Sequence, residues 1–254
     1  MFVDTHCHLD FPEFDNDRKY VIEQALKEDI GFILNPGIDL ESSKRAIQIA
    51  KNFKIVYAAC GIHPHNARSV NNDAFNGCMD LLSEDKVIAI GETGLDFFYQ
   101  NSDIKQQIIL FRKHINFARE NNIPLIVNQR NAEEAVIEIF NEIKFPSKVV
   151  FHCFVSNKIF LDWIIKNNFY ISFTGILTFK SALSLKKLIE NVPIERVFFE
   201  TDSPYLAPHP VRGKRNEPCF VRFIVEEFAR LKRMSVSEVS EITTNNALQF
   251  FGIL

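Results

Sequence analysis

Residues 123–154 read IPLIVNQRNAEEAVIEIFNEIKFPSKVVFHCF and contain a strand, a helix and a second strand in turn. The apolar runs 123–128 and 148–154 have the length and composition of buried strands, and 131–143 repeats apolar residues at helical spacing. Buried strands that alternate with helices are typical of parallel sheets, because the connecting helices cover the faces of the sheet. This stretch therefore predicts two parallel strands joined by a crossover helix.

The same alternation continues in both directions along the chain. Further strands are expected at 2–5, 31–35, 54–60, 86–92, 169–175 and 196–202. Further helices are expected at 17–29, 41–52, 105–122, 181–192, 217–234 and 235–251. Eight such units in 254 residues predict an α/β fold of the (β/α)8 TIM-barrel class, with a doubly wound open sheet as the alternative. Without a linker, low-complexity tract or repeat, residues 1–254 are expected to form a single domain.

Composition excludes several classes of protein. The net charge of -3 gives no basic field for wrapping duplex nucleic acid, so any such contact has to be local. The five cysteines are scattered and contain no CxxC pair, which argues against a disulfide framework and favours a reducing, cytoplasmic location. We see neither a signal peptide nor an apolar run of the roughly 18 residues that a membrane span needs.

Histidines and acids gather at the expected strand ends, which is where barrels of this class carry their chemistry. His6 and His8 follow the first strand and, being two apart, point to the same side of it. Later strand ends or the loops after them carry His63, His65, Glu92, Asn128, His152, Glu200, Asp202 and His209. Each alone has an ordinary structural reading, but a fold built only for stability has no reason to collect them at one rim.

Such a set suits a hydrolytic metal centre. One carboxylate can bridge two divalent ions, histidines can fill the remaining positions, and a second carboxylate can take a proton from metal-bound water. This arrangement stabilises the transition state of phosphodiester hydrolysis. Glu92, from a middle strand, is the best candidate for the bridging catalytic ligand, and Asp202 is the best candidate for the base and ligand.

Several longer motifs follow one another along the chain: VDTHCHLD, GIHPH, IGETGLDF, VVFHCF and ETDSPYLAP followed by RGKRNEP. They resemble the motifs of the TatD family of metal-dependent deoxyribonucleases, a branch of the amidohydrolase superfamily. The resemblance runs in order from residue 3 to near the C-terminus. It implies a distorted (β/α)8 barrel and hydrolysis of ester bonds in DNA, often as a 3′-to-5′ exonuclease on single strands. DNA, single-stranded or at its 3′ ends, is therefore the expected partner.

The resemblance also implies one or two divalent ions, Mg²⁺, Mn²⁺ or Zn²⁺. By position, one ion would be held by His6, His8, Glu92 and Asp202. The second would be held by Glu92, the residue at position 128, and His152. His63 and His65 would lie near the scissile phosphate.

One departure concerns the second ion. The family usually has His at the end of the fifth strand, where this chain has Asn128. An amide oxygen can ligate a hard ion such as Mg²⁺ but is a weaker ligand than imidazole for zinc or manganese. The second metal is therefore expected to be weakly bound, to be Mg²⁺, or to be absent. A smaller departure is His114, inside a predicted helix, where relatives often have Gln.

Two stretches are candidates for substrate contacts. Residues 209–218, HPVRGKRNEP, supply Arg212 and Arg215 just past the eighth strand, where guanidinium forks suit phosphate oxygens. A solvated basic loop is the ordinary alternative. Phe97, Phe98 and Tyr99 either stack on bases or are buried under their loop, the commoner outcome for adjacent aromatics. The phenylalanines of the strands are read as core: Phe151, Phe154, Phe169, Phe173, Phe198 and Phe199.

Three functions are therefore in view. The first is a metal-dependent nuclease, supported by the ligand set and the basic loop. The second is an amidohydrolase acting on an ester, amide or lactone, since the same barrel hosts such enzymes. The third is a protein that kept the fold but lost a metal, for which Asn128 is the sole support.

Overall fold

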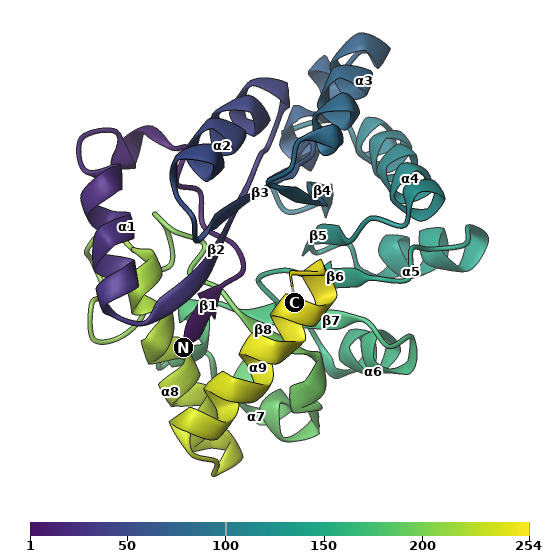
Figure 1. Ribbon diagram of the computed structural model, residues 1–254. Coiled ribbons are helices and arrows are strands. Elements are labelled where there is room, and N and C mark those ends of the chain that lie inside the picture. Colours follow the sequence, from purple (N-terminus) through teal and green to yellow (C-terminus); the bar gives the residue numbers. More distant parts are fainter. Residues whose placement is uncertain (100, 254) are drawn as a thin grey trace. The chain divides into compact units, whose positions relative to one another are not determined.

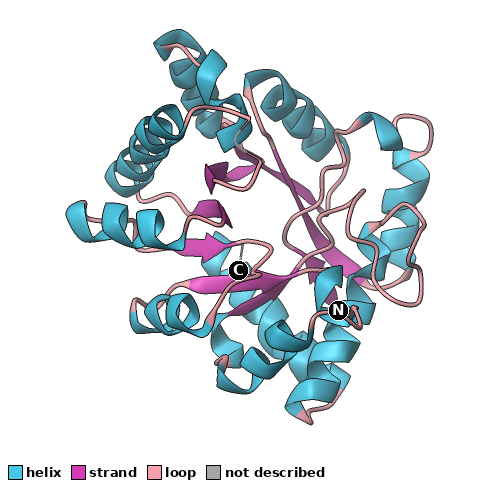
Figure 2. Cartoon of the chain, turned by 180° about the vertical axis from the view of Figure 1, so that it is seen from behind, coloured by secondary structure: helices cyan, strands magenta, loops and turns pink. Residues whose placement is uncertain are grey.

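The computed structural model describes residues 1–99 and 101–253. Within them, eight strands follow one another in chain order, β1 to β8, in one sheet, and helices alternate with them along the chain (Figures 1 and 2). The paired strands run parallel. The predicted (β/α)8 TIM-barrel class is confirmed, because a doubly wound sheet would not keep its strands in chain order.

The contacts divide the chain into two compact units. Unit 1 comprises Met1–Asn35 and Cys153–Leu254, and unit 2 comprises Pro36–His152. The expectation that residues 1–254 form a single domain stays a prediction.

Unit 1 is built from both ends of the chain. Its strands are β1 (Phe2–Asp4), β2 (Ile30–Pro36, of which Pro36 falls in unit 2), β7 (Tyr170–Phe173) and β8 (Val197–Phe199). Its helices are α1 (Arg18–Lys27), α6 (Lys158–Lys166), α7 (Leu183–Leu188), α8 (Val221–Lys232) and α9 (Val236–Phe251). Short 3-10 helices cover Pro12–Phe14, Gly175–Thr178, Ile189–Asn191, Ile194–Arg196 and Pro218–Phe220. The amide of Thr5 donates to the carbonyl of Phe199 at 3.1 Å, which brings the ends of β1 and β8 together.

Unit 2 is one continuous stretch of chain. Its strands are β3 (Val56–Cys60), β4 (Val87–Asp96), β5 (Leu125–Arg130) and β6 (Val149–Phe151). Its helices are α2 (Leu40–Asn52), α3 (Asn72–Asp80), α4 (Ile104–Asn121) and α5 (Glu133–Glu142), with 3-10 helices at Pro64–Ser69 and Leu81–Ser83. The four strands pair in sequence, and Gly94 of β4 lies opposite Asn128 of β5.

Aromatic rings fill the interior of unit 1. The ring of Phe198 stacks on Tyr170 with centroids 4.9 Å apart and meets Phe250 of α9 edge-on at 5.2 Å. All six strand phenylalanines predicted as core are buried, which confirms that reading. Removing one such ring costs about 3–5 kcal/mol, so these contacts fix the strands whose ends carry the polar residues.

Side-chain caps set many of the helix boundaries. Asp39 and Ser42 form a reciprocal capping box at the start of α2, and Asn71 and Asn157 cap α3 and α6. The helices named from the sequence do not include α3 and α6, although eight strand–helix units are expected, and β4 runs four residues past its predicted end at Glu92. In the described part of the chain, no helix has the length and apolarity to cross a membrane.

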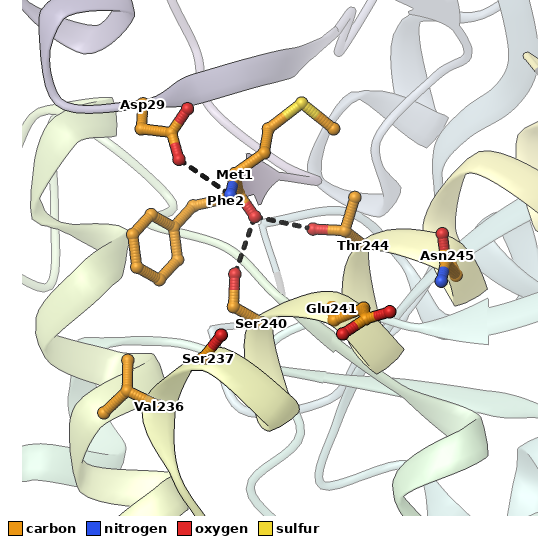
Figure 3. A pocket seen from close by; sticks show the side chains of 9 residues that line it. All are labelled: Met1, Phe2, Asp29, Val236, Ser237, Ser240, Glu241, Thr244 and Asn245. Atoms are coloured by element: carbon orange, nitrogen blue, oxygen red, sulfur yellow. Dashed lines mark hydrogen bonds and ion pairs between the residues drawn. The ribbon is translucent and has the colours of Figure 1, made fainter.

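A cavity of about 550 Å³ lies at the amino end of β1 (Figure 3). The hydroxyls of Ser240 and Thr244, on α9, donate to the carbonyl of Met1 at 2.6 and 3.1 Å. The amino group of Met1 pairs with Asp29 at 2.7 Å. Because His6 and His8 follow the carboxyl end of the same strand, this cavity is separate from the predicted site.

Candidate metal centre

Three of the predicted ligands converge in unit 1. The Nε2 atoms of His6 and His8 lie 3.3 Å apart, as their two-residue spacing predicts. The Oδ1 atom of Asp202 lies 3.9 Å from the first and 3.6 Å from the second. Both imidazoles are buried, whereas the Asp202 side chain keeps 17% of its surface exposed. The cluster therefore presents two nitrogens and one carboxylate oxygen, with the carboxylate reachable from solvent.

Backbone hydrogen bonds hold the segment that carries these histidines. The amide of Cys7 donates to Leu34 of β2 at 2.9 Å, and the amide of Asp202 donates to the carbonyl of His6 at 2.8 Å. In an extended segment successive side chains point to opposite sides, so the two histidines share one side and the intervening Cys7 points to the other. The position of His6 relative to Asp202 is thus fixed by the main chain.

Asp4 adds a side-chain clamp that sequence reasoning did not identify. Its carboxylate accepts from the amide of Thr201 at 2.9 Å and from the Thr201 hydroxyl at 2.6 Å. Burial raises the pKa of Asp4 to about 8, against the opposing effect of these hydrogen bonds. Asp4 therefore ties the end of β1 to the segment after β8, since Asp4 precedes His6 by two residues and Thr201 comes directly before Asp202.

Glu200 is the second addition to the predicted set. Its ligand oxygen lies within 4.8 Å of the ligand nitrogen of His6. One carboxylate oxygen accepts from the amide of Cys153 at 2.6 Å and the other lies 3.4 Å from the Thr5 hydroxyl. A buried carboxylate beside a metal-ligand candidate contributes negative charge that favours a bound cation. The ETD motif placed Glu200 at a strand end, and that position was the available signal.

The remaining predicted ligands converge in unit 2. The Nε2 atom of His152 lies 2.8 Å from Oε1 of Glu92 and 3.4 Å from Oδ1 of Asn128. The Asn128 amide nitrogen donates to the carbonyl of Leu95 at 3.3 Å. That bond orients the amide so that its oxygen, the atom able to ligate a cation, faces His152. All three side chains are buried.

Two glycines determine how Glu92 is presented. Gly91 and Gly94 adopt φ values of +148° and +139°, which residues other than glycine rarely adopt. A Cβ atom at Gly94 would lie 2.0 Å from the carbonyl oxygen of Asn128. The GETG sequence thus lets β4 approach β5 closely on both sides of Glu92.

His63 and His65 lie beside Glu92 and are linked to each other by a hydrogen bond. Nδ1 of His63 accepts from the amide of His65 at 3.1 Å, so the proton of neutral His63 sits on Nε2, which faces Glu92 Oε1 at 3.3 Å. Nε2 of His65 lies 2.8 Å from Oδ2 of the buried Asp96. Burial lowers the pKa of His65, with the neighbouring His63 acting in the same direction. His63 is therefore a hydrogen-bond donor at the edge of the cluster.

The two predicted phosphate ligands of the basic loop differ in their surroundings. The guanidinium of Arg215 makes a double hydrogen bond to Asp17, at 2.8 and 2.7 Å, and a third to Glu217 at 2.9 Å. Arg212 is exposed, and its guanidinium carbon lies 3.9 Å from the centroid of Phe179. Phosphate binding stays a prediction for both residues, but Arg215 would have to leave Asp17 to do it.

The residues present fit divalent cations. Each cluster combines buried imidazole with acceptor oxygens, which are the donor types of zinc, manganese and magnesium sites. In unit 1 the Nε2 atoms of two imidazoles and one carboxylate oxygen lie 3.3 to 3.9 Å from one another. Donor atoms this close together suit a shared cation.

Comparison with known proteins gives a consistent result. A model of the family described as TatD related DNase matches residues 3–252. The chain is 38% identical over 254 residues to YabD of Bacillus subtilis, named an uncharacterized metal-dependent hydrolase, with 100% of both chains covered. It is 37% identical over 259 residues to YcfH of Escherichia coli, which carries the same description, with 100% of this chain and 96% of the relative covered.

Solved structures place the fold in the same group. The structure of YJJV, a TatD homologue from Escherichia coli, superimposes with a TM-score of 0.93 at 25% identity, covering 99% of this chain and 98% of that one. An organophosphorus hydrolase from Deinococcus radiodurans superimposes with a TM-score of 0.70 at 12% identity, covering 99% and 92%. The second likeness shows an amidohydrolase-like fold alone.

Proposed function

This chain belongs to the family of TatD-related DNases and is a metal-dependent hydrolase, and on that premise we propose that it cleaves phosphodiester bonds in DNA. The proposed substrate is single-stranded DNA or a 3′ end, degraded in the 3′-to-5′ direction. The observation that carries the proposal is the pair of converging donor clusters, one around Asp202 and one around Glu92. The cytoplasmic location is proposed on the cysteines, none of which forms a disulfide in the described residues.

The proposed ligand sets follow the family pattern. His6, His8, Glu92 and Asp202 would hold one ion, and Glu92, Asn128 and His152 would hold a second. Bound divalent ions supply an acidified water and neutralise charge on the phosphate. Glu200 is not assigned as a ligand and contributes negative charge beside His6.

The chain's own side chains would carry the remaining roles. Asp202 is the proposed base, because its partly exposed carboxylate can accept a proton within reach of solvent. His63 donates from Nε2, toward a phosphate oxygen when substrate is present. Arg212, exposed and without an ion pair among the described contacts, is the better placed of the two arginines to meet phosphate.

The test is cleavage of a labelled single-stranded oligonucleotide with Mg²⁺ or Mn²⁺ added, run beside the same reaction with chelator. We expect cleavage that depends on the metal and stops when it is removed. DNA left intact under all metal conditions would refute the nuclease function. Turnover of esters, amides or lactones in the same preparations would then identify the amidohydrolase alternative, and no turnover at all would favour a protein that has lost its metal.

A further inference from the structure

The turn after β4 exposes two adjacent aromatic rings. Phe98 keeps 60% of its surface exposed and Tyr99 keeps 55%, so of the two alternatives left open for this triplet, burial under the loop is wrong for two of its three members. The rings meet edge-to-face with centroids 4.8 Å apart. Single exposed apolar residues are ordinary, but two neighbouring rings on one turn form a surface that a flat partner can cover.

A buried carboxylate holds this turn in place. Asp96 is 1% exposed, and its Oδ1 atom accepts from the amides of Phe98 and Tyr99, each at 2.9 Å. The amide of Phe97 donates to the carbonyl of Arg130 at 2.9 Å, and the amide of Asp96 donates to Gln107 at 2.8 Å. The rings therefore stand on an ordered backbone, which lowers the entropy that a ligand must overcome in binding.

The surroundings of the rings are cationic and polar. The guanidinium carbon of Arg130 lies 5.2 Å from the Tyr99 ring centroid, and the His65 and Tyr99 rings lie at 87° to each other with centroids 5.8 Å apart. Arg130 is exposed. An aromatic ring beside an exposed arginine suits a nucleotide, because the base can stack on the ring while the arginine neutralises the phosphate. A purely apolar partner would have to bury that charge.

A chain of contacts within unit 2 leads from this turn to the proposed reaction centre. His65 shares Asp96 with the turn, and its ring centroid lies 4.3 Å from that of His63, which faces Glu92. A nucleotide stacked on Tyr99 would thus lie beside the side chains proposed to meet the phosphate. These three contacts link the turn to the reaction centre side chain by side chain. The turn could therefore bind a base while the histidines bind the neighbouring phosphate of the same strand.

We propose that Phe98 and Tyr99 form a stacking platform for the bases of a single-stranded DNA end, with Arg130 neutralising a phosphate beside it. This inference rests on the proposed nuclease function and adds the feature of the substrate that the turn recognises. Asp96 acts as a positioning residue for the platform. Since every base has a flat face, the platform binds without strong sequence preference.

The test compares oligonucleotides with and without bases. The full-length chain carrying Asp202→Asn, which blocks turnover, is titrated with a fluorescent single-stranded oligonucleotide and with one that is abasic at its last 3′ positions. We expect the abasic oligonucleotide to bind about tenfold more weakly. Adding Phe98→Ala and Tyr99→Ala together should weaken the ordinary oligonucleotide to the abasic level, whereas Tyr99→Phe, which keeps the ring, should not.

Two controls separate the platform from folding and from chemistry. Tyr20→Ala removes another exposed ring, from α1, and should keep the preference for bases. The metal content and the melting temperature of the Phe98→Ala, Tyr99→Ala chain that retains Asp202 should equal those of the parent, because both rings are exposed. Equal binding of both oligonucleotides by the parent, or a preference that survives loss of both rings, would overturn the platform. Base preference without any cleavage of DNA would overturn the nuclease function alone.

Discussion

Asp202 is the residue on which the proposed proton transfer depends. It sits at φ +54°, in the left-handed region where Asn is one of the few residues tolerated. Asp202→Asn should therefore keep the fold while removing the base and one ligand charge, and kcat on single-stranded DNA should fall by at least about 100-fold. Steady-state kinetics with a thermal melt of both proteins checks this. Activity within a few-fold of the parent at equal Tm would remove Asp202 from the role.

Asn128 determines how well the second ion is held. The amide oxygen already faces His152, so Asn128→His would replace an oxygen ligand by an imidazole in the same cluster. We expect the affinity for Mn²⁺ or Zn²⁺ to rise by about tenfold, equivalent to about 1.4 kcal/mol, with less change for Mg²⁺. Calorimetric metal titration of the two proteins measures it. Identical isotherms would mean that the residue at 128 is not a ligand.

At the scale of single residues, the sequence predicted side chains whose direction follows from local periodicity. His6 and His8 converge because residues two apart in an extended segment share a side. Asp4 and Asp96 were not assigned a role, because their partners come from elsewhere. Asp4 binds Thr201, 197 residues further along the chain, and Asp96 binds His65, 31 residues back. Residue spacing predicts contacts between neighbours on one strand or helix, so it cannot predict pairs that lie this far apart in the sequence.

The packing of α4 against β4 creates a pH-sensitive element. His114 is fully buried; its Nδ1 lies 2.9 Å from the carbonyl of Leu110 and 3.0 Å from the Thr93 hydroxyl. Since a carbonyl can only accept, the proton sits on Nδ1. Its Nε2 has no hydrogen-bond partner among the described residues. Burial lowers the pKa of His114 to about 4. Between pH 6.5 and pH 4, His114 is therefore protonated in the unfolded chain but neutral in the folded one.

The stability contributed by neutral His114 is thus complete above pH 6.5 and is lost as the pH falls toward 4. His114→Gln removes the titrating imidazole and, with it, this dependence of stability on pH. Between pH 7 and pH 4.5 the parent should lose about 2 kcal/mol more free energy of unfolding than the variant. Urea unfolding of both proteins at the two pH values measures the difference. Equal losses would show that His114 binds a proton in the folded state at its ordinary pKa.

The loop after β8 contains a matched pair for mutation. Arg215→Ala should lower the free energy of unfolding by about 1 kcal/mol, because it breaks the partly buried fork to Asp17. Arg212→Ala loses the contact with the Phe179 ring rather than a double hydrogen bond to a carboxylate, so it should lower stability less than Arg215→Ala while weakening DNA binding. Urea unfolding and anisotropy titrations of both variants decide between the roles. If Arg215→Ala weakened DNA binding without lowering the free energy of unfolding, the double hydrogen bond from Arg215 to Asp17 would not be structural.

Among the secondary-structure elements, strands were easier to predict than their limits. All eight expected strands are present, because strands covered on both faces read as continuous apolar runs. The end of β4 was missed because GETGLD has the composition of a turn, yet Thr93 to Asp96 pair with β5. The helix α3 was missed because NDAFNGCMD is short and polar and has a central glycine.

The charge of the whole chain limits how DNA is attracted. The net charge of -3 offers no long-range attraction to DNA, so the proposed phosphate contacts would be confined to a few side chains such as Arg212 and Arg130. The logarithm of the DNA-binding constant should therefore fall against the logarithm of salt concentration with a slope of only about -1 to -2. Titrations from low to moderate salt give the slope. A value several times steeper would reveal a basic surface beyond these residues.

The division of the chain into a continuous unit and one made from both ends sets an order of events during translation. The ribosome completes Pro36–His152, with Glu92 inside it, while β8 and Asp202 are still unmade. At about 5–20 residues per second, the interval from His152 to Asp202 is about 3–10 seconds. Throughout that time Asp4 lacks Thr201 and the histidines lack their carboxylate. If Asp202 has its proposed role, the nascent chain would stay inactive until β8 and Asp202 have been made, so the order of synthesis itself would delay hydrolysis.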